Sequence, residues 1–244
     1  MAHPPIEAFD ELDSTNAEAR RRAEAGDYGP AWISAKRQTE GRGRRGRAWN
    51  TQDGNLAATL LMRCAMPPAQ AAQVSFVAAL ACADLADKFL GSGAAALKWP
   101  NDLLIQGRKA AGILVESGTI AAGDLWLAIG IGVNLKRAPG DVTPPATAFA
   151  DHSPTPPEPL EALEVLAACF DDWRQVWERD GFAPIAAAWT ARAHGLGEYC
   201  QARLPAETIR GVAEGLDPDG ALRLRLEGGA LARITAGDVF FGEA

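Results

Sequence analysis

The sequence has few of the residues that build metal centres and disulfide frameworks. Its 244 residues include only four cysteines and three histidines. The cysteines lie far apart without a C-x-x-C pair, so we expect reduced, mostly buried thiols and neither a disulfide framework nor a zinc site. The histidines are equally scattered without metal-ligand spacing, so we expect structural or surface roles for them. These residues are Cys64, Cys82, Cys169, Cys200, His3, His152 and His194.

Long apolar runs and an overall positive charge are also missing. No uninterrupted apolar segment reaches the roughly 18 residues of a membrane-spanning helix. No signal-peptide pattern opens the chain, so we expect a cytoplasmic protein with no membrane partner. The formal net charge of -7 argues against a general nucleic-acid binder, which needs a basic face. With 48% hydrophobic residues, the chain can bury the core of one large domain, or of a main domain with a small appendage.

Positive charge is instead concentrated in residues 36–49 (KRQTEGRGRRGRAW). This stretch holds six Lys and Arg residues and a single acid, Glu40. Gly41, Gly43 and Gly46 are interspersed among the arginines, so the backbone can turn tightly while guanidinium groups close on a phosphate or carboxylate. The pattern indicates a nucleotide cradle or a nucleic-acid patch. The alternative is a solvated basic loop or an RGG-like RNA-binding segment.

The segment before this stretch combines hydroxyl side chains with a helix start. Residues 6–9 alternate as a short strand, and residues 17–26 (AEARRRAEAG) predict a helix. Thr15 and Glu18 have the spacing of a capping box. Ser14 and Thr15 therefore either cap the helix or present hydroxyl groups to a polar ligand at its N-terminus.

The middle of the chain predicts further strands around a buried helix. Residues 32–34 and 55–63 are expected to be strands, and residues 70–90 have the apolar spacing of a core helix. In the sequence KWPND, proline keeps the preceding residue extended and Asn-Asp favours a turn. Lys98 and Asp102 should therefore flank a strand end.

A hairpin is predicted directly afterwards, formed by residues 103–106 and 110–116. Lys109 lies at the start of its second strand. This lysine is either a solvated charge at a strand end or a functional amine, since the following Ala-Ala-Gly leaves little bulk around it.

Residues 125–135 (LWLAIGIGVNL) predict a strand with two unlike faces. Every odd-numbered position is apolar, whereas the even-numbered ones include Gly130 and Gly132. A face without side chains allows close approach by a ligand or by a neighbouring backbone. Asn134 at the strand end either presents its amide to a base edge or caps a turn.

The sequence pattern changes twice in the rest of the chain. A proline-rich connection over residues 138–159 precedes helices predicted at residues 160–179 and 182–193. Their tryptophans are expected to pack in the core or against a partner and not to form a cofactor site. About five short alternating runs follow, separated by turn residues, and they predict a small SH3-like barrel. We therefore expect two domains, residues 1–194 and 195–244.

Taken in order, the motifs resemble those of the biotin protein ligases. They are DSTN, QxxGRGRRGRxW, KWPND, RKxAGILVE, GxGxN and a C-terminal GLDPDGAL. The likeness runs from about Leu12 to the C-terminus, and the arginine motif and KWPND are each specific. Some members also repress transcription through a preceding helix-turn-helix domain. Only about a dozen residues precede DSTN here, so we expect a form that does not bind DNA.

The resemblance implies an α+β fold, with a mixed central β-sheet flanked by helices as in biotin/lipoate ligases and class II synthetases, followed by the small barrel. It also implies a two-step acyl transfer. Biotin and MgATP would form biotinyl-5'-adenylate and pyrophosphate, and a lysine of a biotin carboxyl carrier protein would then take the biotinyl group. No enzyme nucleophile is needed, because positioned cations can screen both anions.

The resemblance also implies roles for individual residues. Polar side chains of DSTN and the following motif would bind the ureido part of biotin, and the glycines and the first arginine of the arginine motif would lie near its carboxylate. The expected biotin-binding residues are Ser14, Thr15, Asn16, Gln38, Gly41, Arg42, Gly43, Arg44, Lys109 and Gly112.

The expected ATP and adenylate contacts overlap with this set. Trp49 would cover the adenine once the loop orders over the adenylate, and Asn134 would touch the base. The full set is Arg42, Arg44, Arg45, Trp49, Lys109 and Asn134. Catalytic roles fall to Arg44, Lys109, Asp102 and Lys98, of which the last two would lie beside the incoming lysine. Magnesium ligands are not assigned.

Two alternatives remain open at this point. A lipoate ligase or octanoyltransferase would share the fold but should carry a different arginine motif. A non-catalytic RNA-binding module would use the basic stretch alone and would leave Lys109 without a role. Glu40 is an unexpected acid near phosphates, and the sequence leaves open whether the chain is a monomer or a homodimer.

Overall fold

The computed structural model describes residues 3–120, 123–140 and 142–242. Its centre is a seven-stranded sheet in the order β1-β2-β3-β7-β6-β5-β4. The β1–β2 pair is parallel and the remaining pairs are antiparallel, so the sheet is mixed, as predicted. Its strands are β1 Ile6–Leu12, β2 Ala31–Gln38, β3 Leu56–Cys64, β4 Ala95–Lys98, β5 Asp102–Ile105, β6 Arg108–Thr119 and β7 Leu125–Val133.

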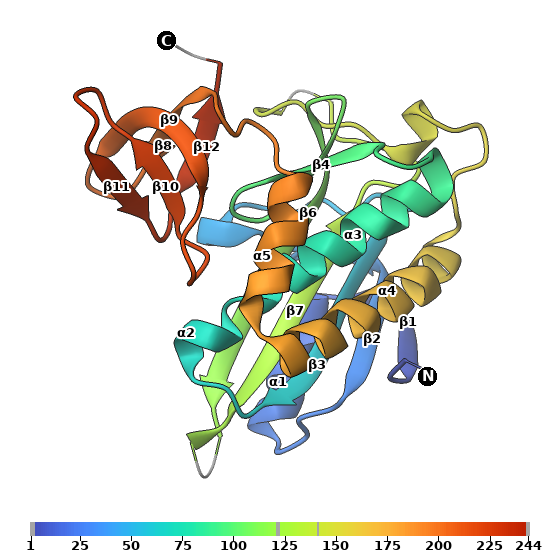
Figure 1. Cartoon of the computed structure of the whole chain (residues 1–244). Coiled ribbons are helices and arrows are strands. Elements are labelled where there is room, and N and C mark those ends of the chain that lie inside the picture. The colour runs from blue at the N-terminus through green and yellow to red at the C-terminus, as the bar shows by residue number, and fades with distance from the viewer. Residues whose placement is uncertain (1–2, 121–122, 141, 243–244) are drawn as a thin grey trace.

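Helices cover both faces of this sheet (Figure 1). The helices α3, α4 and α5 pack together on one side of the sheet, and α1 lies on the other. The helices are α1 Thr15–Glu24, α2 Pro68–Ala71, α3 Val74–Leu90, α4 Pro159–Asp180 and α5 Phe182–Ala191. The sheet flanked by helices confirms the α+β prediction.

The period-two pattern of β7 sets which side of the sheet carries the main core. Leu127, Ile129 and Ile131 are buried in the main apolar cluster, together with residues of α3 and α4. On the opposite face, Ala128 packs with alanines of α1. The face that carries Gly130 and Gly132 is therefore the α1 side, because alternate residues of a strand point the same way.

Two local predictions about helices are wrong. The helix expected over residues 70–90 is interrupted: α2 ends at Ala71, and α3 starts at Val74. The capping box is not formed either, because the side chain of the N-cap residue Ser14 makes no capping hydrogen bond. Glu18 instead pairs with Arg21 and Arg22 in the next turn.

The long apolar segment Pro68–Leu90 belongs to the core. Its length and composition match those of a membrane-spanning helix, yet 72% of its 18-residue window is buried inside the fold. Large aromatic side chains pack around it. Phe76 makes edge-to-face contacts with Phe182 and Trp189, at centroid distances of 5.2 and 5.6 Å. Trp177 and Trp189 are buried, which confirms their predicted packing role.

The C-terminal residues form a second sheet, which we call the C-terminal sheet. Five antiparallel strands follow the order β11-β10-β9-β8-β12, and they lie beside the β4 end of the main sheet (Figure 1). A hydrogen bond of 3.1 Å from Trp99 Nε1 to Gly220 O ties the two sheets together. Its strands are β8 Tyr199–Arg203, β9 Thr208–Leu216, β10 Leu222–Arg225, β11 Leu231–Ile234 and β12 Asp238–Phe241.

All four cysteines are free thiols, and three of them are buried. Burial raises the pKa of the Cys82 thiol to about 12 and that of Cys169 to about 11. Thiols with such pKa values stay protonated near neutral pH and are poor nucleophiles. The expectation that the cysteines are mostly buried is therefore confirmed.

Asn55 directly precedes β3, and its side chain holds the turn that follows β7. Its buried Oδ1 accepts hydrogen bonds from the backbone N–H groups of Leu135, Lys136 and Arg137, at 3.0, 3.0 and 3.2 Å. Its Nδ2 donates to Arg137 O at 2.7 Å. We expect Asn55→Ala to lower the free energy of unfolding by about 2–3 kcal/mol, because buried donors lose their acceptor.

Urea unfolding followed by circular dichroism measures this loss. Asn55→Asp is the matched comparison, since it keeps the acceptor oxygen while it replaces the donor by a second oxygen and adds a negative charge. We expect Asn55→Asp to retain more stability than Asn55→Ala. Equal stabilities of Asn55→Ala and the wild type would contradict the capping role.

Candidate active site

A cavity of about 330 Å³ opens on the sheet between the segments predicted to carry the chemistry. It is lined from several directions: by the β1–α1 turn, the basic stretch, the start of β6, the end of β7 and the first residues of β12. All residues predicted for the site line this cavity except Gly41 and Arg45. Glu40 is exposed and does not line it.

A chain of hydrogen-bonding side chains forms one end of the cavity. Gln38 Oε1 accepts hydrogen bonds from the backbone N–H of Thr15 at 2.8 Å and from its hydroxyl at 3.2 Å. Gln38 Nε2 donates to Thr51 Oγ1 at 2.9 Å. The hydroxyl of Thr59, which is fully buried, lies 2.8 Å from Thr15 Oγ1 and 2.7 Å from Asn16 Oδ1. This end can read both donors and acceptors of a polar ligand group.

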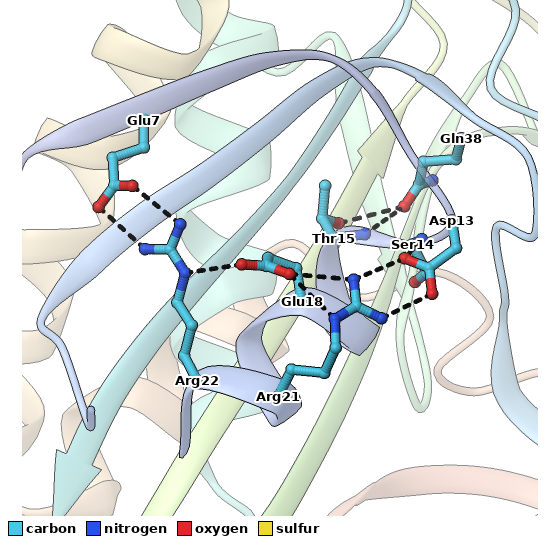
Figure 2. Close-up of polar contacts among 8 residues, drawn as sticks. All are labelled: Glu7, Asp13, Ser14, Thr15, Glu18, Arg21, Arg22 and Gln38. Carbon is cyan, nitrogen blue, oxygen red and sulfur yellow. Dashed lines mark hydrogen bonds and ion pairs between the residues drawn. The ribbon is translucent and has the colours of Figure 1, made fainter. Parts of the chain in front are cut away.

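Arginines of α1 brace this end from outside (Figure 2). Arg22 pairs with Glu7 on β1 at 2.8 Å and with Glu18 at 3.0 Å. Arg21 pairs with Glu18 at 3.0 Å and bidentately with Asp13, at 2.7 and 2.9 Å. These ion pairs are partly exposed, so each of them contributes little to the free energy of folding by itself.

These ion pairs fix the backbone position of Ser14. The Asp13 carboxylate accepts a hydrogen bond from the Ser14 backbone N–H at 2.7 Å, so Arg21 and Asp13 together fix the turn that presents the Ser14 and Thr15 side chains (Figure 2). The hydrogen bond from Arg21 lowers the pKa of Asp13 to about 2. Asp13 therefore remains ionised throughout the neutral range.

Glycines on β7 leave room for side chains of other segments to pack directly on the strand backbone. A Cβ built on Gly130 would collide with the Asn16 carboxamide, and one built on Gly132 would collide with the Trp49 ring. Asn16 also donates to Glu116 Oε2 at 2.8 Å and to Leu114 O at 3.3 Å. The bare face thus seats Asn16 and Trp49, and in this way it shapes the cavity wall.

Lys109 and Asp102 lie together on the cavity floor. Lys109 Nζ lies 2.6 Å from Asp102 Oδ1, as an ion pair without hydrogen-bond geometry. It also lies 5.6 Å from the centroid of the Trp49 ring. Gly112 leaves room here, because a Cβ at that position would lie 3.2 Å from both Lys109 and Trp49. Lys109 is therefore a half-buried cation held inside the site.

A second amine lies in the same region. Burial is the main cause that lowers the pKa of Lys98, with a smaller contribution from Lys109, whereas Asp102 and Asp238 oppose the shift. The Lys98 ammonium stacks over the Phe240 ring of the C-terminal sheet at 5.5 Å. An amine with a lowered pKa reaches its neutral form at a lower pH than an ordinary lysine.

Arginines of the basic stretch close the opposite side of the cavity. The Arg42 side chain is partly exposed, but its Nη2 atom is buried without a hydrogen-bond partner and lies 3.9 Å from Glu116 Oε2. Arg44 donates to Asn101 Oδ1 at 3.2 Å, and burial is the main cause that lowers its pKa. A buried guanidinium nitrogen without a partner is an anion-binding group, because leaving it unpaired is costly.

Asn134 is held by backbone groups at the end of β7. Its Nδ2 donates to Thr147 O at 3.1 Å, and its backbone N–H donates to Ala110 O at 2.8 Å. The carboxamide therefore fastens the segment after β7 to the strand while lining the cavity. The turn after β7 is capped by Asn55, not by Asn134.

Three further residues of the site were not assigned a role from the sequence. Thr59 lies inside an apolar strand, Asn101 is hidden within KWPND, and Asp238 follows the C-terminal sheet's last turn. Asn101 Nδ2 donates to Ile113 O at 2.7 Å, so it fixes β6 while it accepts from Arg44. Thr59 could have been suspected as a hydroxyl on an otherwise apolar buried strand.

Thr59→Val is expected to raise the KM for the substrate bound at this polar end of the cavity about 10-fold, because the buried hydroxyl that orders Thr15 and Asn16 is replaced by a methyl group. Steady-state kinetics with varied concentrations of that substrate measures the change. Thr147→Val is the matched control: it removes another fully buried hydroxyl, which donates to Asp151 at 2.8 Å. A KM raised equally in both variants would contradict the ordering role.

Known proteins share both the sequence and the architecture. Residues 9–134 match the Biotin/lipoate A/B protein ligase family, and residues 195–242 match the biotin protein ligase C-terminal domain. The chain is 46% identical over 236 residues to a biotin–[acetyl-CoA-carboxylase] ligase of Paracoccus denitrificans, covering 94% of this chain and 98% of that one. The chain belongs to the biotin protein ligase family. As a member it is an ATP-dependent ligase, and the predicted resemblance is confirmed.

Three further proteins resemble this ligase at lower sequence identity. The bifunctional ligase/repressor of Bacillus subtilis (strain 168) is 30% identical, covering 96% of this chain and 73% of that protein. The biotin protein ligase of Aquifex aeolicus, in complex with biotin and ATP, has the same fold, with a TM-score of 0.81, 24% identity and coverage of 98% and 99%. The Leishmania major ligase with biotinyl-5-AMP is 25% identical, with a TM-score of 0.69 and coverage of 96% and 99%.

Proposed function

We propose that this cavity joins biotin to ATP and passes the biotinyl group to one lysine of a biotin carboxyl carrier protein. One observation supports this proposal most strongly. The polar pocket around Thr15 and Gln38 belongs to the same cavity as three cationic side chains, those of Arg42, Arg44 and Lys109. A urea-like ring fits the polar end, since both its N–H and C=O groups can be satisfied there. The carboxylate and the phosphates then fall at the cationic end.

The first step forms one bond and breaks another. A biotin carboxylate oxygen attacks the α-phosphorus of ATP, the bond to the β-phosphate breaks, and pyrophosphate leaves. Both reactants are anions, so their approach is opposed until cations screen the charge. Lys109 would hold carboxyl and phosphate oxygens together, Arg42 would lie near the carboxylate, and Arg44 would face the phosphate. Arg45, Gly41 and Gly43 would shape the loop around them.

The second step transfers the acyl group. The ε-amine of the carrier lysine attacks the carbonyl carbon, the bond to AMP breaks, and the amine loses one proton. Lys98 and Asp102 lie beside this path. Burial lowers the pKa of Lys98, so its neutral, proton-accepting form is easier to reach than that of an ordinary lysine, and Asp102 would orient the incoming amine. Trp49 would cover the adenine, and Asn134 would support the base from the end of β7.

Magnesium would arrive with the triphosphate. Among the described residues, no three His, Cys, Asp or Glu side chains are grouped as a metal site. Mg²⁺ commonly binds through substrate phosphates and only one or two carboxylates, and Asp102 is a carboxylate in reach of the cavity. The ion would add to the screening of the triphosphate charge.

A competition experiment separates biotin from related acids. Purified protein is offered biotin, lipoate and octanoate in turn with MgATP, and mass spectrometry identifies the adenylate and the modified carrier domain. We expect adenylation of biotin and modification of a single carrier lysine. Adenylation of lipoate without adenylation of biotin would overturn the proposal. We place this reaction in the cytoplasm, where the free thiols stay reduced.

A further inference from the structure

One carboxylate of the C-terminal sheet holds three arginines of the basic stretch. Asp238 lies at the start of β12, and its oxygens lie 3.8 Å from Arg44 Nη1 and 3.2 Å from Arg45 Nη1. Arg47 Nη2 pairs with the same carboxylate. The Asp238 side chain is only 15% exposed, whereas that of Arg47 is 60% exposed, so the loop side chains reach inward to a fixed anion.

Backbone acceptors around Asp238 reinforce this contact. Gly237 O accepts hydrogen bonds from both terminal nitrogens of Arg44, at 3.3 and 3.2 Å. Arg203 O on β8 accepts one from Arg45 Nη2 at 3.3 Å. The contacts join segments 158 to 193 residues apart in the chain. Such a cluster of charge-assisted bonds is stronger than an isolated surface pair.

The backbone of the loop is tightly folded where these contacts act. Arg45 has a φ of 56°, in the left-handed region that non-glycine residues rarely adopt. Gly43 N donates to Arg47 O at 2.7 Å, and Trp49 N donates to Gly41 O at 2.8 Å, which closes the loop on itself. Both terminal nitrogens of the Arg45 guanidinium are held by the C-terminal sheet. The sheet thus stabilises a conformation that local propensity disfavours.

We propose that Asp238 is a positioning residue that latches the arginine loop, residues 39–49, over the cavity. The latch keeps Arg42, Arg44 and Trp49 at the cavity wall, where they would meet the nucleotide. Asp238 acts through these residues and does not take part in bond making. The effect on turnover rests on the proposed function, whereas the latch itself does not.

Limited proteolysis tests the latch without any substrate. Trypsin cleaves after arginine, and cleavage of a transiently open loop tracks the population of its open form. We expect Asp238→Asn to increase the rate of cleavage after residues 42–47 in the ligand-free protein about 10-fold. Asp238→Glu should restore most of the protection, since it retains the charge. Peptide mapping by mass spectrometry locates the cleavage sites.

Asp219→Asn is the matched control. Asp219 belongs to the same C-terminal sheet region and pairs with Arg233 at 2.6 Å, away from the arginine loop. We expect trypsin to cleave the arginine loop of the Asp219→Asn variant at the wild-type rate. Arg47→Gln is a second variant, which removes one partner of Asp238 without changing β12. It should also speed cleavage after Arg42 and Arg44, and it tests the latch independently of the folding of Asp238→Asn. Wild-type cleavage rates in both Asp238→Asn and Arg47→Gln would overturn the latch.

Kinetics separate a positioning role from a general loss of stability. We expect Asp238→Asn to unfold within a few degrees of the wild type but to release its adenylate faster and to show a higher KM for ATP. The KM for biotin should rise less than the KM for ATP, because the polar end of the cavity around Thr15 and Gln38 does not contact β12 and only the carboxylate end of biotin would meet the loop. Equal rises of both KM values would contradict positioning. A wild-type protein that forms no adenylate would refute the proposed function, and the proteolysis would still decide the latch.

Discussion

Lys109→Met is expected to slow adenylate formation about 10²- to 10³-fold. Lys109 is a cation at the floor of the cavity, 2.6 Å from Asp102 and beneath Trp49. Removing one preorganised electrostatic contact to a charged transition state typically costs this much in rate. The KM for biotin should change far less, because the polar end around Thr15 and Gln38 stays intact. Single-turnover formation of biotinyl-adenylate, measured without a carrier, isolates this step.

The variant also leaves Asp102 without its counter-charge. A lone carboxylate would repel the triphosphate, so part of the loss in Lys109→Met belongs to Asp102. The double variant Lys109→Met/Asp102→Asn should therefore form adenylate faster than Lys109→Met, while remaining slower than the wild type. Lys109→Arg should retain more activity than either. Adenylation by Lys109→Met within 10-fold of the wild type would contradict the assignment of Lys109.

Arg44→Gly is expected to release the adenylate at least about 10-fold faster, with adenylate formation still measurable. Arg44 lies at the mouth of the cavity between Asn101 and Gly237, and glycine can make none of these contacts. Losing hydrogen bonds from a charged group costs about 1.5–3 kcal/mol, and 1.4 kcal/mol corresponds to a factor of ten. An adenylate that escapes should modify lysines of unrelated proteins.

Two measurements check this result. Rapid filtration gives the lifetime of the bound adenylate, and mass spectrometry counts modified lysines on serum albumin added as bystander. Arg44→Lys is the matched variant, since it keeps one positive charge but not the planar fork, and it should retain the adenylate better than Arg44→Gly. Tight retention by Arg44→Gly would contradict the role given to Arg44.

Local patterns predict much of this fold. The alternation of apolar residues in residues 125–135 places β7, and the spacing of small and apolar residues places the main helices within a few residues of their observed ends. The pattern also identifies the bare face of β7. It does not reveal that Asn16 and Trp49 fill that face, because the partners of a strand face are set by tertiary packing.

The limits of prediction at the site have the same origin. Asp238 meets the arginine loop across more than 190 residues of chain, and no motif near Asp238 signals the contact. The prediction of a capping box is wrong because tertiary partners compete for the same groups. Gln38 accepts hydrogen bonds from Thr15, and Arg21 and Arg22 pair with Glu18. Residues within motifs can be predicted because the chemistry constrains their local spacing, whereas the residues that position them are constrained only in space.

An acidic protein with a local cationic cavity suits a reaction between two anions. The net charge of -7 disfavours non-specific binding of nucleic acids, while the clustered guanidinium groups and Lys109 act at short range. Asp102 and Asp238 pair with this cluster, so mutual repulsion of the cations is partly offset.

The most direct test of the charge-screening account is the release of pyrophosphate by the purified protein from biotin and MgATP, in the absence of any carrier. We predict a rapid burst of about one pyrophosphate per cavity, followed by slow turnover, because the adenylate stays bound. The burst should depend on biotin and should be lost in Lys109→Met on the same timescale. A protein that releases no pyrophosphate with both substrates present would contradict the account.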